Sequence, residues 1–280
     1  MTTLCAQPYE ITEKEFQLFK DIIYRQTGIH MSEKKRNLIV ARLSKRLRAL
    51  NLKNFSEYYK YISENLNASE EIINLINRIT TNKTDFFREK HHFELLLHEI
   101  FPTIIKDGYS LRERRLRIWS AGCSSGEEPY SIAMTVSEAL TGERGWDTKI
   151  LATDLDTDVL TKASLGVYPS QSVTSVPMGY LSKYFDRTAQ GYEVSHKIKS
   201  MVVFRKLNLM NPVFPMKMPF DIIFCRNVMI YFDENTKRSL VTKLYSHLKD
   251  GGHIFVGHSE TLMWQKNLFK FLKHTVYQKV

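Results

Sequence analysis

Two glycines and two carboxylates lie together at a predicted strand-to-helix turn. A buried strand is expected over residues 117–121, and Gly122 and Gly126 bracket a turn that leads into Glu127 and Glu128. Glycines allow a tight turn and let a ligand approach the backbone beside the start of the next helix. The spacing differs from the dinucleotide fingerprint G-x-G-x-x-G, and the two acids would repel a pyrophosphate. The turn indicates a ligand with a positive group or free hydroxyls, and a loop without a ligand is the alternative.

A further acidic residue, Asp154, ends the strand expected over residues 149–154. In a nucleoside-binding α/β fold, an acid at this place accepts hydrogen bonds from ribose hydroxyls. The alternative is that the aspartates here only cap the following helix, a role that suits Asp156 or Asp158 better. The glycine loop and Asp154 together predict adenosine binding, with Asp154 as the ribose ligand.

The elements that must position these residues indicate an α/β fold. From residue 117 onward, β-rich runs alternate with helical stretches, which predicts a mostly parallel sheet covered by helices on both faces. Further strands are expected at residues 201–206, 220–225, 253–258 and within 273–280. Residues 180–205 interrupt the alternation, and they predict a small inserted antiparallel unit built from a short helix and the strands 192–198 and 201–206.

The first eighty residues contain almost no glycine or proline and favour a bundle of about four helices. Thr12 and Glu15 form a capping box at the start of the first predicted helix, and Gly28 marks its end. Apolar residues expected in the core recur at helical spacing: Phe16, Phe19, Ile22 and Ile23, followed by Ile39, Leu43, Leu47 and Leu50.

A basic run accompanies the second of these helices. Residues 34–48 hold seven lysines and arginines and no acid. Such a run is usually a solvated face. Because Arg42, Lys45 and Arg46 flank the apolar stripe as a separate face, with Lys35 beside them, a docking surface for an acidic partner is the competing interpretation.

Composition limits the class of protein. The chain has 280 residues, 43% of them hydrophobic and 25% charged, which suits a globular protein of two domains. The apolar runs are far shorter than a membrane span requires, and the N-terminus carries no signal-peptide pattern, so a cytoplasmic protein is expected. The net charge of +10 predicts an acidic partner, which leaves nucleic acid, an anionic membrane and an acidic protein segment open.

Cysteines and histidines give no metal pattern. Three cysteines, none closely spaced, argue against a disulfide framework and a thiolate zinc site. The histidines at 91, 92, 247, 253 and 258 do not follow a spacing such as H-E-x-x-H and are expected to be structural. No metal ion is therefore expected.

Five segments carry a specific resemblance to a known family. They are ITTNKTDFFREKHHF (79–93), RIWSAGCSSGEEPYSIAM (117–134), ILATDLDTDVL (150–160), FDIIFCRNVMIYFD (220–233) and KDGGHIFVGHSE (249–260). On these segments the chain resembles the CheR family, the S-adenosylmethionine-dependent protein-glutamate O-methyltransferases of bacterial chemotaxis. The resemblance implies a Rossmann-like class I methyltransferase sheet with an inserted antiparallel β-subdomain, preceded by an all-α domain.

The resemblance also implies particular site residues. Positions matching the family's cofactor contacts are Asn82, Thr84, Arg88, Glu127, Asp154, Asn208, Leu209, Arg226 and Asn227. Among these, Glu127 would lie near the methionine ammonium, Asp154 at the ribose, and Asn208 and Leu209 beside the adenine. Arg88, Arg226 and Tyr231 are the candidates for orienting the acceptor carboxylate.

Domain roles and partners follow from the same resemblance. Residues 9–80 would form a receptor-docking domain that uses Lys35, Arg42, Lys45 and Arg46, residues 81–98 a linker that contributes to the cofactor site, and residues 99–280 the catalytic domain with its β-subdomain at about 180–205. The substrate would be glutamates on the cytoplasmic methylation helices of chemotaxis receptors, the product their 5-O-methyl esters, and the protein a monomer recruited to those membrane receptors. The family's β-subdomain can grip a receptor C-terminal pentapeptide, but the short connection 187–192 holds a single glycine, which argues against such tethering here.

Two other functions compete with this interpretation. A nucleic-acid methyltransferase would suit the basic charge, but residues 211–214 lack the second proline of an N-P-P-Y/F motif and precede the fourth strand. A non-catalytic receptor-binding module of the same fold is the other, and the intact acids and the Arg226-Asn227 pair weigh against it.

Overall fold

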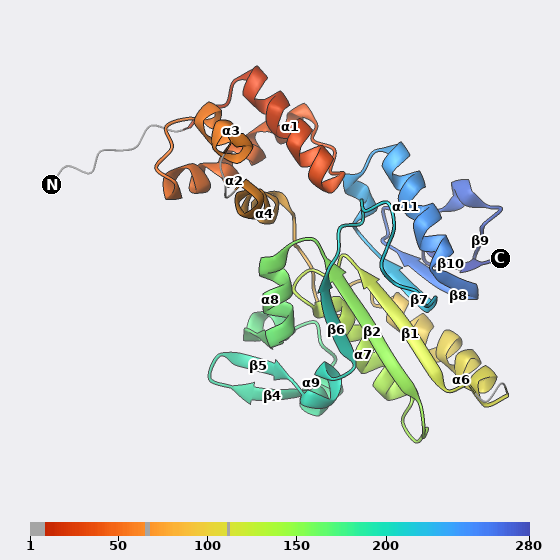
Figure 1. Cartoon of the computed structure of the whole chain (residues 1–280). Coiled ribbons are helices and arrows are strands. Elements are labelled where there is room, and N and C mark those ends of the chain that lie inside the picture. The colour runs from red at the N-terminus through yellow and green to blue at the C-terminus, as the bar shows by residue number, and fades with distance from the viewer. Residues whose placement is uncertain (1–8, 65–67, 111–112) are drawn as a thin grey trace. The chain divides into compact units, whose positions relative to one another are not determined.

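A computed structural model describes residues 9–64, 68–110 and 113–280 of the chain (Figure 1). These residues form two compact units. The first contains the chain up to Thr81 together with a short later segment, Tyr231–Asp233. The second contains Asn82–Ile230 and Glu234–Val280. The chain therefore passes from one unit to the other more than once.

The first unit is helical, as the sequence predicts. Within its described residues it contains α1 (Glu13–Thr27), α2 (Arg36–Ala49), α3 (Phe55–Glu64) and α4 (Ala68–Ile79), with a 3₁₀ turn, η1 (Glu33–Lys35), before α2. None of the helices described in either unit is both long and apolar enough to cross a membrane.

Local sequence signals explain the first helix. The Thr12 hydroxyl accepts a hydrogen bond from the Glu15 backbone N–H at 3.3 Å, and the Glu15 carboxylate accepts from the Thr12 N–H at 2.8 Å. Gly28 ends the helix with a φ of 72°, a left-handed conformation that costs glycine little. The predicted apolar face is buried in full, and Phe19 stacks on Tyr58 of α3.

The second unit is built on one large sheet. In order of sequence its strands are β1 (Arg115–Ala121), β2 (Asp147–Asp154), β6 (Val202–Lys206), β7 (Phe220–Cys225), β8 (Leu248–Val256), β9 (Phe269–Phe271) and β10 (Val276–Lys279). The order across the sheet is β6-β2-β1-β7-β8-β10-β9, parallel as far as β8 and antiparallel at β10. This is the Rossmann-like sheet that the sequence predicts.

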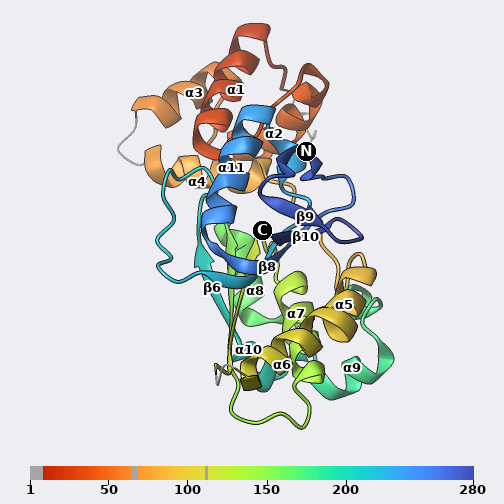
Figure 2. The same cartoon turned by 90° about the vertical axis from the view of Figure 1, so that its right-hand side faces the viewer.

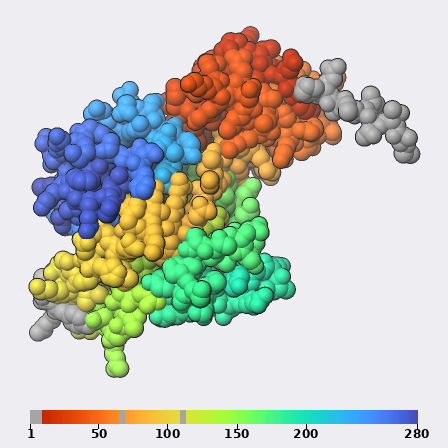
Figure 3. Space-filling view, turned by 180° about the vertical axis from the view of Figure 1, so that it is seen from behind, coloured from red at the N-terminus to blue at the C-terminus, as the bar shows by residue number. Residues whose placement is uncertain are grey.

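Helices cover both faces of this sheet. The helices of the second unit are α5 (His91–Leu95), the π-helical turn η2 (Leu96–Ile100), α6 (Phe101–Ser110), α7 (Glu127–Ala139), α8 (Thr157–Leu165), α9 (Met178–Tyr184), α10 (His196–Lys199) and α11 (Glu234–Ser246), with 3₁₀ turns η3 (Ser170–Val173) and η5 (Met263–Gln265). A further 3₁₀ turn, η4 (Met229–Tyr231), ends at the first residue of the short segment assigned to the first unit. The connections from β1 to β2 and from β7 to β8 run in opposite directions across the sheet, so right-handed crossovers place α7 and α11 on opposite faces (Figure 1). Figure 2 shows α5, α6 and α7 side by side, and in the view from behind the yellow segment crosses the middle of the visible face of this unit, between its blue and green parts (Figure 3).

The point where the strand order reverses lies between β1 and β7. In open α/β sheets, ligands bind outside the carboxyl ends of the strands at this place. The strands that meet there are buried on both faces, with Ile118, Trp119 and Phe224 fully excluded from solvent. The core therefore holds rigid the strand ends from which the candidate site residues project.

The small antiparallel sheet differs from the prediction. It consists of β3 (Val167–Tyr168), β5 (Gly191–Val194) and β4 (Phe185–Thr188), in that order. The assignment of residues 201–206 to this unit is wrong, because β6 pairs in parallel with β2 at the edge of the large sheet. The strand predicted over 192–198 ends at Val194, and α10 then turns the chain toward β6.

Candidate cofactor site

The loop after β1 is fixed by its own backbone. Gly122, Ser124 and Gly126 all have left-handed φ values, of 86°, 49° and 98°. The N–H groups of Gly122 and Cys123 both donate to the carbonyl oxygen of Thr153, at 2.8 and 2.9 Å. A Cβ on Gly122 would lie 2.4 Å from a methyl group of Val228, so glycine is required there for space as well as for conformation.

These hydrogen bonds decide which ligands the loop suits. Besides the two N–H groups that bind Thr153, the N–H of Gly126 donates to the Cys123 carbonyl at 3.1 Å and that of Ser124 to Asp154 Oδ2 at 2.8 Å. A phosphate-binding loop presents such N–H groups to its ligand. Here four of them are used within the protein, which supports the prediction that the ligand is not a dinucleotide.

Asp154 holds two loops together at the end of β2. Its Oδ2 accepts from the N–H of Ser124, and its Oδ1 accepts from the N–H of Asp156 at 3.0 Å. Burial raises the pKa of Asp154, while these backbone bonds lower it. Each carboxylate oxygen has a second lone pair, so the side chain can still accept a hydrogen bond from a hydroxyl group. Asp156 caps α8 by accepting from the N–H of Asp158 at 2.9 Å, as the sequence predicts.

Two further predicted residues lie beside Asp154 and Asp156. The Asn82 side chain donates to Asp156 Oδ2 at 2.6 Å, and the backbone carbonyl of Asn82 accepts from the Ser124 hydroxyl at 2.9 Å. After β6, the N–H of Leu207 donates to the Asp154 carbonyl at 2.9 Å, which places Asn208 next to the end of β2. The structure thus brings three separate sequence segments to one edge of the sheet.

Three of the predicted cofactor residues on these segments are Leu209, Asn208 and Thr84. Leu209 is buried, and Asn208 Oδ1 accepts from the N–H of Met210 at 2.9 Å. Thr84 is half-buried on the segment that follows Asn82. Their contacts with a cofactor stay predictions.

The first turn of α7 buries two carboxylates. Glu127 accepts from the Ser125 hydroxyl at 2.7 Å, and Glu128 accepts from the Ser120 hydroxyl at 2.7 Å. Burial raises the pKa of both carboxyl groups. Glu128 already pairs with a cation, Arg226, at 3.2 Å, so Glu127 is the carboxylate of this turn that suits a cationic ligand.

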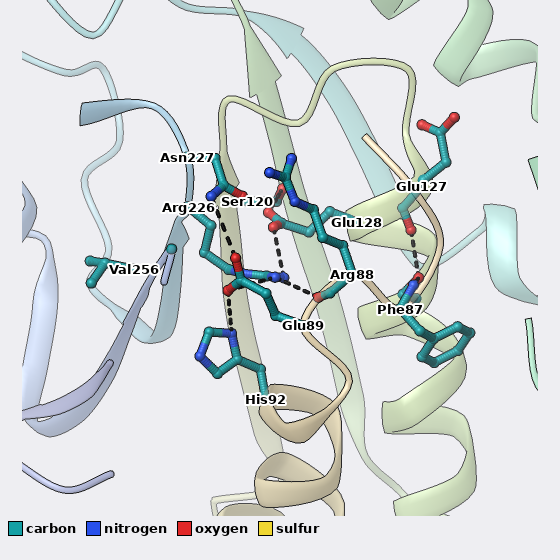
Figure 4. Close-up of polar contacts among 12 residues, drawn as sticks. Phe87, Arg88, Glu89, His92, Ser120, Glu127, Glu128, Arg226, Asn227 and Val256 are labelled. Atoms are coloured by element: carbon teal, nitrogen blue, oxygen red, sulfur yellow. Dashed lines mark hydrogen bonds and ion pairs between the residues drawn. The ribbon is translucent and has the colours of Figure 1, made fainter. Parts of the chain in front are cut away.

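Arg226 is the centre of a buried charge network (Figure 4). Its side chain is only 1% exposed, and its guanidinium lies 3.1 Å from Glu89 Oε2 and 3.2 Å from Glu128 Oε2. It also donates to the backbone carbonyl of Arg88 at 2.5 Å. Burial acts to raise the pKa of Glu89, but the charge and hydrogen bond of Arg226, together with the His258 N–H and the charge of His92, outweigh burial, and the pKa is lowered. This geometry favours a positioning role for Arg226, which fixes the backbone of Arg88.

Asn227 and the end of β8 form a tight turn beside this network. Asn227 has a left-handed φ of 58°, and its N–H donates to Glu260 Oε2 at 2.8 Å. The same oxygen accepts from the N–H of Gly257 at 2.6 Å. A Cβ on Gly257 would lie 2.3 Å from Asn227 Nδ2, so a larger residue would displace the asparagine.

Comparison with known proteins gives two family matches. Residues 14–80 match the model of the CheR methyltransferase all-alpha domain, and residues 82–278 match that of the CheR methyltransferase SAM binding domain. This chain belongs to the CheR methyltransferase family. The two matches meet in the chain where the two compact units meet.

Curated relatives extend over nearly the whole chain. A chemotaxis protein methyltransferase of Borreliella burgdorferi is 42% identical over 271 residues, covering 96% of this chain and 95% of the relative. Chemotaxis protein methyltransferase 2 of Pseudomonas aeruginosa is 39% identical over 97% of this chain and 95% of its own length. The chemotaxis protein methyltransferase of Escherichia coli is 38% identical over 99% of this chain and 95% of its own length.

In this member of the CheR family, the sequence left several site residues unidentified. The sequence does not identify Glu89 or Glu260 as site residues. It offers Glu128 only as an alternative to Glu127. The signal that could have found Glu89 and Glu128 is the predicted Arg226 itself: an arginine directly after a buried strand needs carboxylate partners. Their identity depends on contacts between segments 98 or more residues apart.

Tyr231 belongs to the first unit. Its carbonyl accepts from the N–H of His30 at 2.8 Å, and Lys35 Nζ lies 5.4 Å from the centre of its ring. The structure therefore describes Tyr231 with the helical unit and separately from Arg88 and Arg226. Its role in orienting an acceptor stays a prediction.

The predicted docking residues have different local roles. Arg46 forms a two-pronged ion pair with Glu71 of α4 at 2.6 and 2.5 Å, and Arg42 donates to the carbonyls of Ile79 and Thr80 at the end of that helix. These two arginines hold α2 to α4. Lys45 is exposed. Of the four residues, Lys45 offers the cleanest test of docking.

Proposed function

We propose that this CheR family methyltransferase transfers a methyl group from S-adenosylmethionine to the side-chain carboxylate of specific glutamates in chemotaxis receptors. The products would be glutamate 5-O-methyl esters and S-adenosylhomocysteine. The observation that carries the proposal is the buried carboxylate of Glu127 at the start of α7, directly after the glycine loop, which suits a cationic cofactor, in a chain whose relatives are chemotaxis protein methyltransferases.

The residues present fit this cofactor. Asp154 would accept the ribose hydroxyls, and Asn208 and Leu209 would contact the adenine. Glu127 would face the methionine ammonium, with Asn82, Thr84 and Asn227 completing the site. When bound, S-adenosylmethionine supplies a methyl carbon made electrophilic by a positively charged sulfur.

The acceptor requires no activation by a base. A glutamate side chain has a pKa of about 4.3, so its carboxylate is already ionised at neutral pH. A carboxylate oxygen attacks the methyl carbon in line with the carbon–sulfur bond, whose electron pair returns to sulfur, and no proton moves. No metal ion is needed to assist a leaving group that departs neutral.

The contribution of this chain is then position. Holding two reactants in line can lower a barrier by roughly 7–11 kcal/mol in well-oriented systems. Arg88 is half-buried, and Arg226 donates a hydrogen bond to its backbone carbonyl. Its side chain would orient the acceptor with a hydrogen bond. A close ion pair would reduce the nucleophilicity of the carboxylate, so we expect a single, modest contact.

The acceptor glutamates would lie on the cytoplasmic methylation helices of the receptors, and the protein would act as a cytoplasmic monomer that docks through α2. The β4–β5 hairpin turns through only Ala189 and Gln190. So short a turn supports the expectation that a receptor C-terminal tail is not gripped here.

The docking step has a matched test. We expect Lys45→Glu to raise the KM for receptor several-fold at low salt and less at high salt, because surface charges act mainly on encounter and are screened. Lys60→Glu, the same charge change on the exposed face of α3, is the control and should leave the KM unchanged. Equal kinetics for both variants at low salt would reject docking through α2.

Radiolabelled methyl transfer tests the function itself. The full chain is incubated with labelled S-adenosylmethionine and either receptor-containing membranes or RNA. We expect base-labile label on receptor glutamates, located by mass spectrometry, and none on RNA. Label on RNA, or cofactor binding without any labelled receptor, would overturn the proposal.

A further inference from the structure

Four histidines that are separated in the sequence meet in the second unit. They are His91 and His92 at the start of α5, His258 after β8, and His274 before β10. The rings of His91 and His258 are parallel within 4°, with centres 4.7 Å apart, and their Nε2 atoms are 3.0 Å apart. The sequence predicts structural roles for His91, His92 and His258, and it makes no prediction for His274.

A carboxylate joins the histidine pair. One ligand atom each from Glu89, His91 and His258 lie within 4.8 Å of one another. The Glu89 side chain also accepts from the backbone N–H of His258 at 3.3 Å, which holds it beside the histidine. His258 is exposed and the other two residues are half-buried, so an ion from solvent can reach the group.

We propose that Glu89, His91 and His258 form a binding site for a first-row transition-metal ion, with Zn²⁺ as the ion that suits it best. Zinc lies about 2.0–2.1 Å from an imidazole nitrogen, so two such nitrogens on a tetrahedral ion are roughly 3.3–3.4 Å apart. The two Nε2 atoms share a hydrogen bond at 3.0 Å, so an ion that replaces this bond needs them to separate by only a few tenths of an ångström. Two imidazoles and one carboxylate are also a donor set found in zinc enzymes, which leaves the fourth position to water.

The site is connected to the cofactor site through Glu89. The same carboxylate pairs with Arg226, whose guanidinium holds both Glu128 and the backbone of Arg88. An ion bound to Glu89 competes with Arg226 for its charge and so weakens the contact that fixes Arg88. Zinc is therefore expected to inhibit methyl transfer. This second step rests on the proposed function, whereas ion binding does not.

Calorimetry on the untagged, metal-free chain tests the site directly. Titration with ZnCl₂ in a non-chelating buffer should show one ion per chain. His91→Ala and His258→Ala should each weaken binding at least tenfold, because each removes one of three ligands. His98→Ala, an exposed histidine on the adjacent π-helical turn, is the matched control and should bind as the wild type does. Co²⁺ in place of Zn²⁺ should give visible absorption bands that disappear in the same two variants.

The outcomes separate binding from inhibition. Absence of zinc binding in the wild type would overturn the site. Equal zinc affinity in the wild type and both ligand variants would also overturn it, because the ion would then bind only adventitiously at the surface. Thermal unfolding and S-adenosylhomocysteine affinity of the variants show that their fold is kept. The ratio of methyl transfer with and without zinc should fall in the wild type and stay near one in His258→Ala. A bound ion that changes neither this ratio nor cofactor affinity would overturn the inhibition.

Discussion

Asp154 connects the fold to the proposed chemistry through a single side chain. Its two oxygens each accept one backbone N–H, from loops that follow different strands. The remaining lone pairs can accept hydrogen bonds from a polar ligand. Asn82 and Asn208, which lie nearby, come from two further segments of the chain. Loss of this carboxylate should therefore affect the ligand more than the strands.

We expect Asp154→Ala to weaken S-adenosylhomocysteine binding at least tenfold, about 1.4 kcal/mol or more, because a ribose acceptor is lost. Calorimetry measures the affinity, and circular dichroism should show an unchanged fold. Asp158→Ala, an exposed acid on the helix that follows, is the control. Unchanged affinity in Asp154→Ala would remove the ribose assignment.

Arg226 is a second residue whose role can be separated. Replacing one partner of a buried ion pair leaves the others uncompensated, which typically costs about 3–5 kcal/mol. We expect Arg226→Met to lower the free energy of unfolding by about this amount, because Glu89 and Glu128 lose their common cation.

Urea denaturation measures this loss, and Arg187→Met, at an exposed position of β4, should cost far less. Adding Glu128→Gln to Arg226→Met should recover part of the stability, since one buried charge is removed. A single variant as stable as the wild type would show that the network contributes little to the fold.

At the scale of elements, the turn after β7 is close-packed against the end of β8, and the contact cannot accept a larger side chain at Gly257 without a shift. Gly257 lies so close to Asn227 that a Cβ at this position would be 2.3 Å from Asn227 Nδ2. Overpacking of this kind costs typically 1–3 kcal/mol. The contact couples the position of Asn227 to the strand that leads to His258.

We expect Gly257→Ala to lower the free energy of unfolding by about 1–3 kcal/mol and to weaken cofactor binding, because Asn227 must move. Gly179→Ala in α9 is a suitable control, since a Cβ there meets nothing within 4 Å and alanine favours the helix. Chemical denaturation and calorimetry on both variants measure the difference. Equal stability of the two would mean that the turn can adapt.

The elements also show what sequence could and could not predict. The capping box at Thr12, the stop at Gly28 and the apolar runs of β1 and β7 are local signals, and each element forms where they place it. The pairing of β6 with β2 depends on residues that are distant in the sequence. The sequence therefore predicts the strand at residues 201–206 but places it in the wrong sheet.

The candidate site follows the same rule. Asp154 and the β1–α7 loop were predicted from residue type at a strand end. The pairing of His91 with His258 could not be predicted, because the two histidines are 167 residues apart. Glu89 could not be predicted either, because its role depends on contacts with the distant His258 and with the buried Arg226.

At the scale of the molecule, burial of a histidine makes stability depend on pH. His253 lies in β8, and burial lowers its pKa from 6.5 to about 4. The unfolded chain binds a proton at this residue below pH 6.5, and the folded chain does so only below about pH 4. The stability contributed by the neutral histidine is thus complete above pH 6.5 and is lost as pH falls toward 4.

We expect the free energy of unfolding to fall from pH 7 to pH 5.5 by about 1 kcal/mol more in the wild type than in His253→Gln. Urea denaturation at both pH values, with a chelator present, measures the two differences. Identical differences in the two proteins would show that His253 protonates freely in the folded state.

The passage of the chain between its two units has a consequence for dissecting the protein. Because Tyr231–Asp233 clusters with the helical unit, the catalytic half is not one uninterrupted stretch of sequence. A fragment starting at Asn82 would keep these three residues but lose Ile29 and His30, the backbone partners of Phe232 and Tyr231. Cleavage at the boundary would therefore remove the backbone partners of Tyr231 and Phe232, which follow Arg226 and Asn227 closely in the chain.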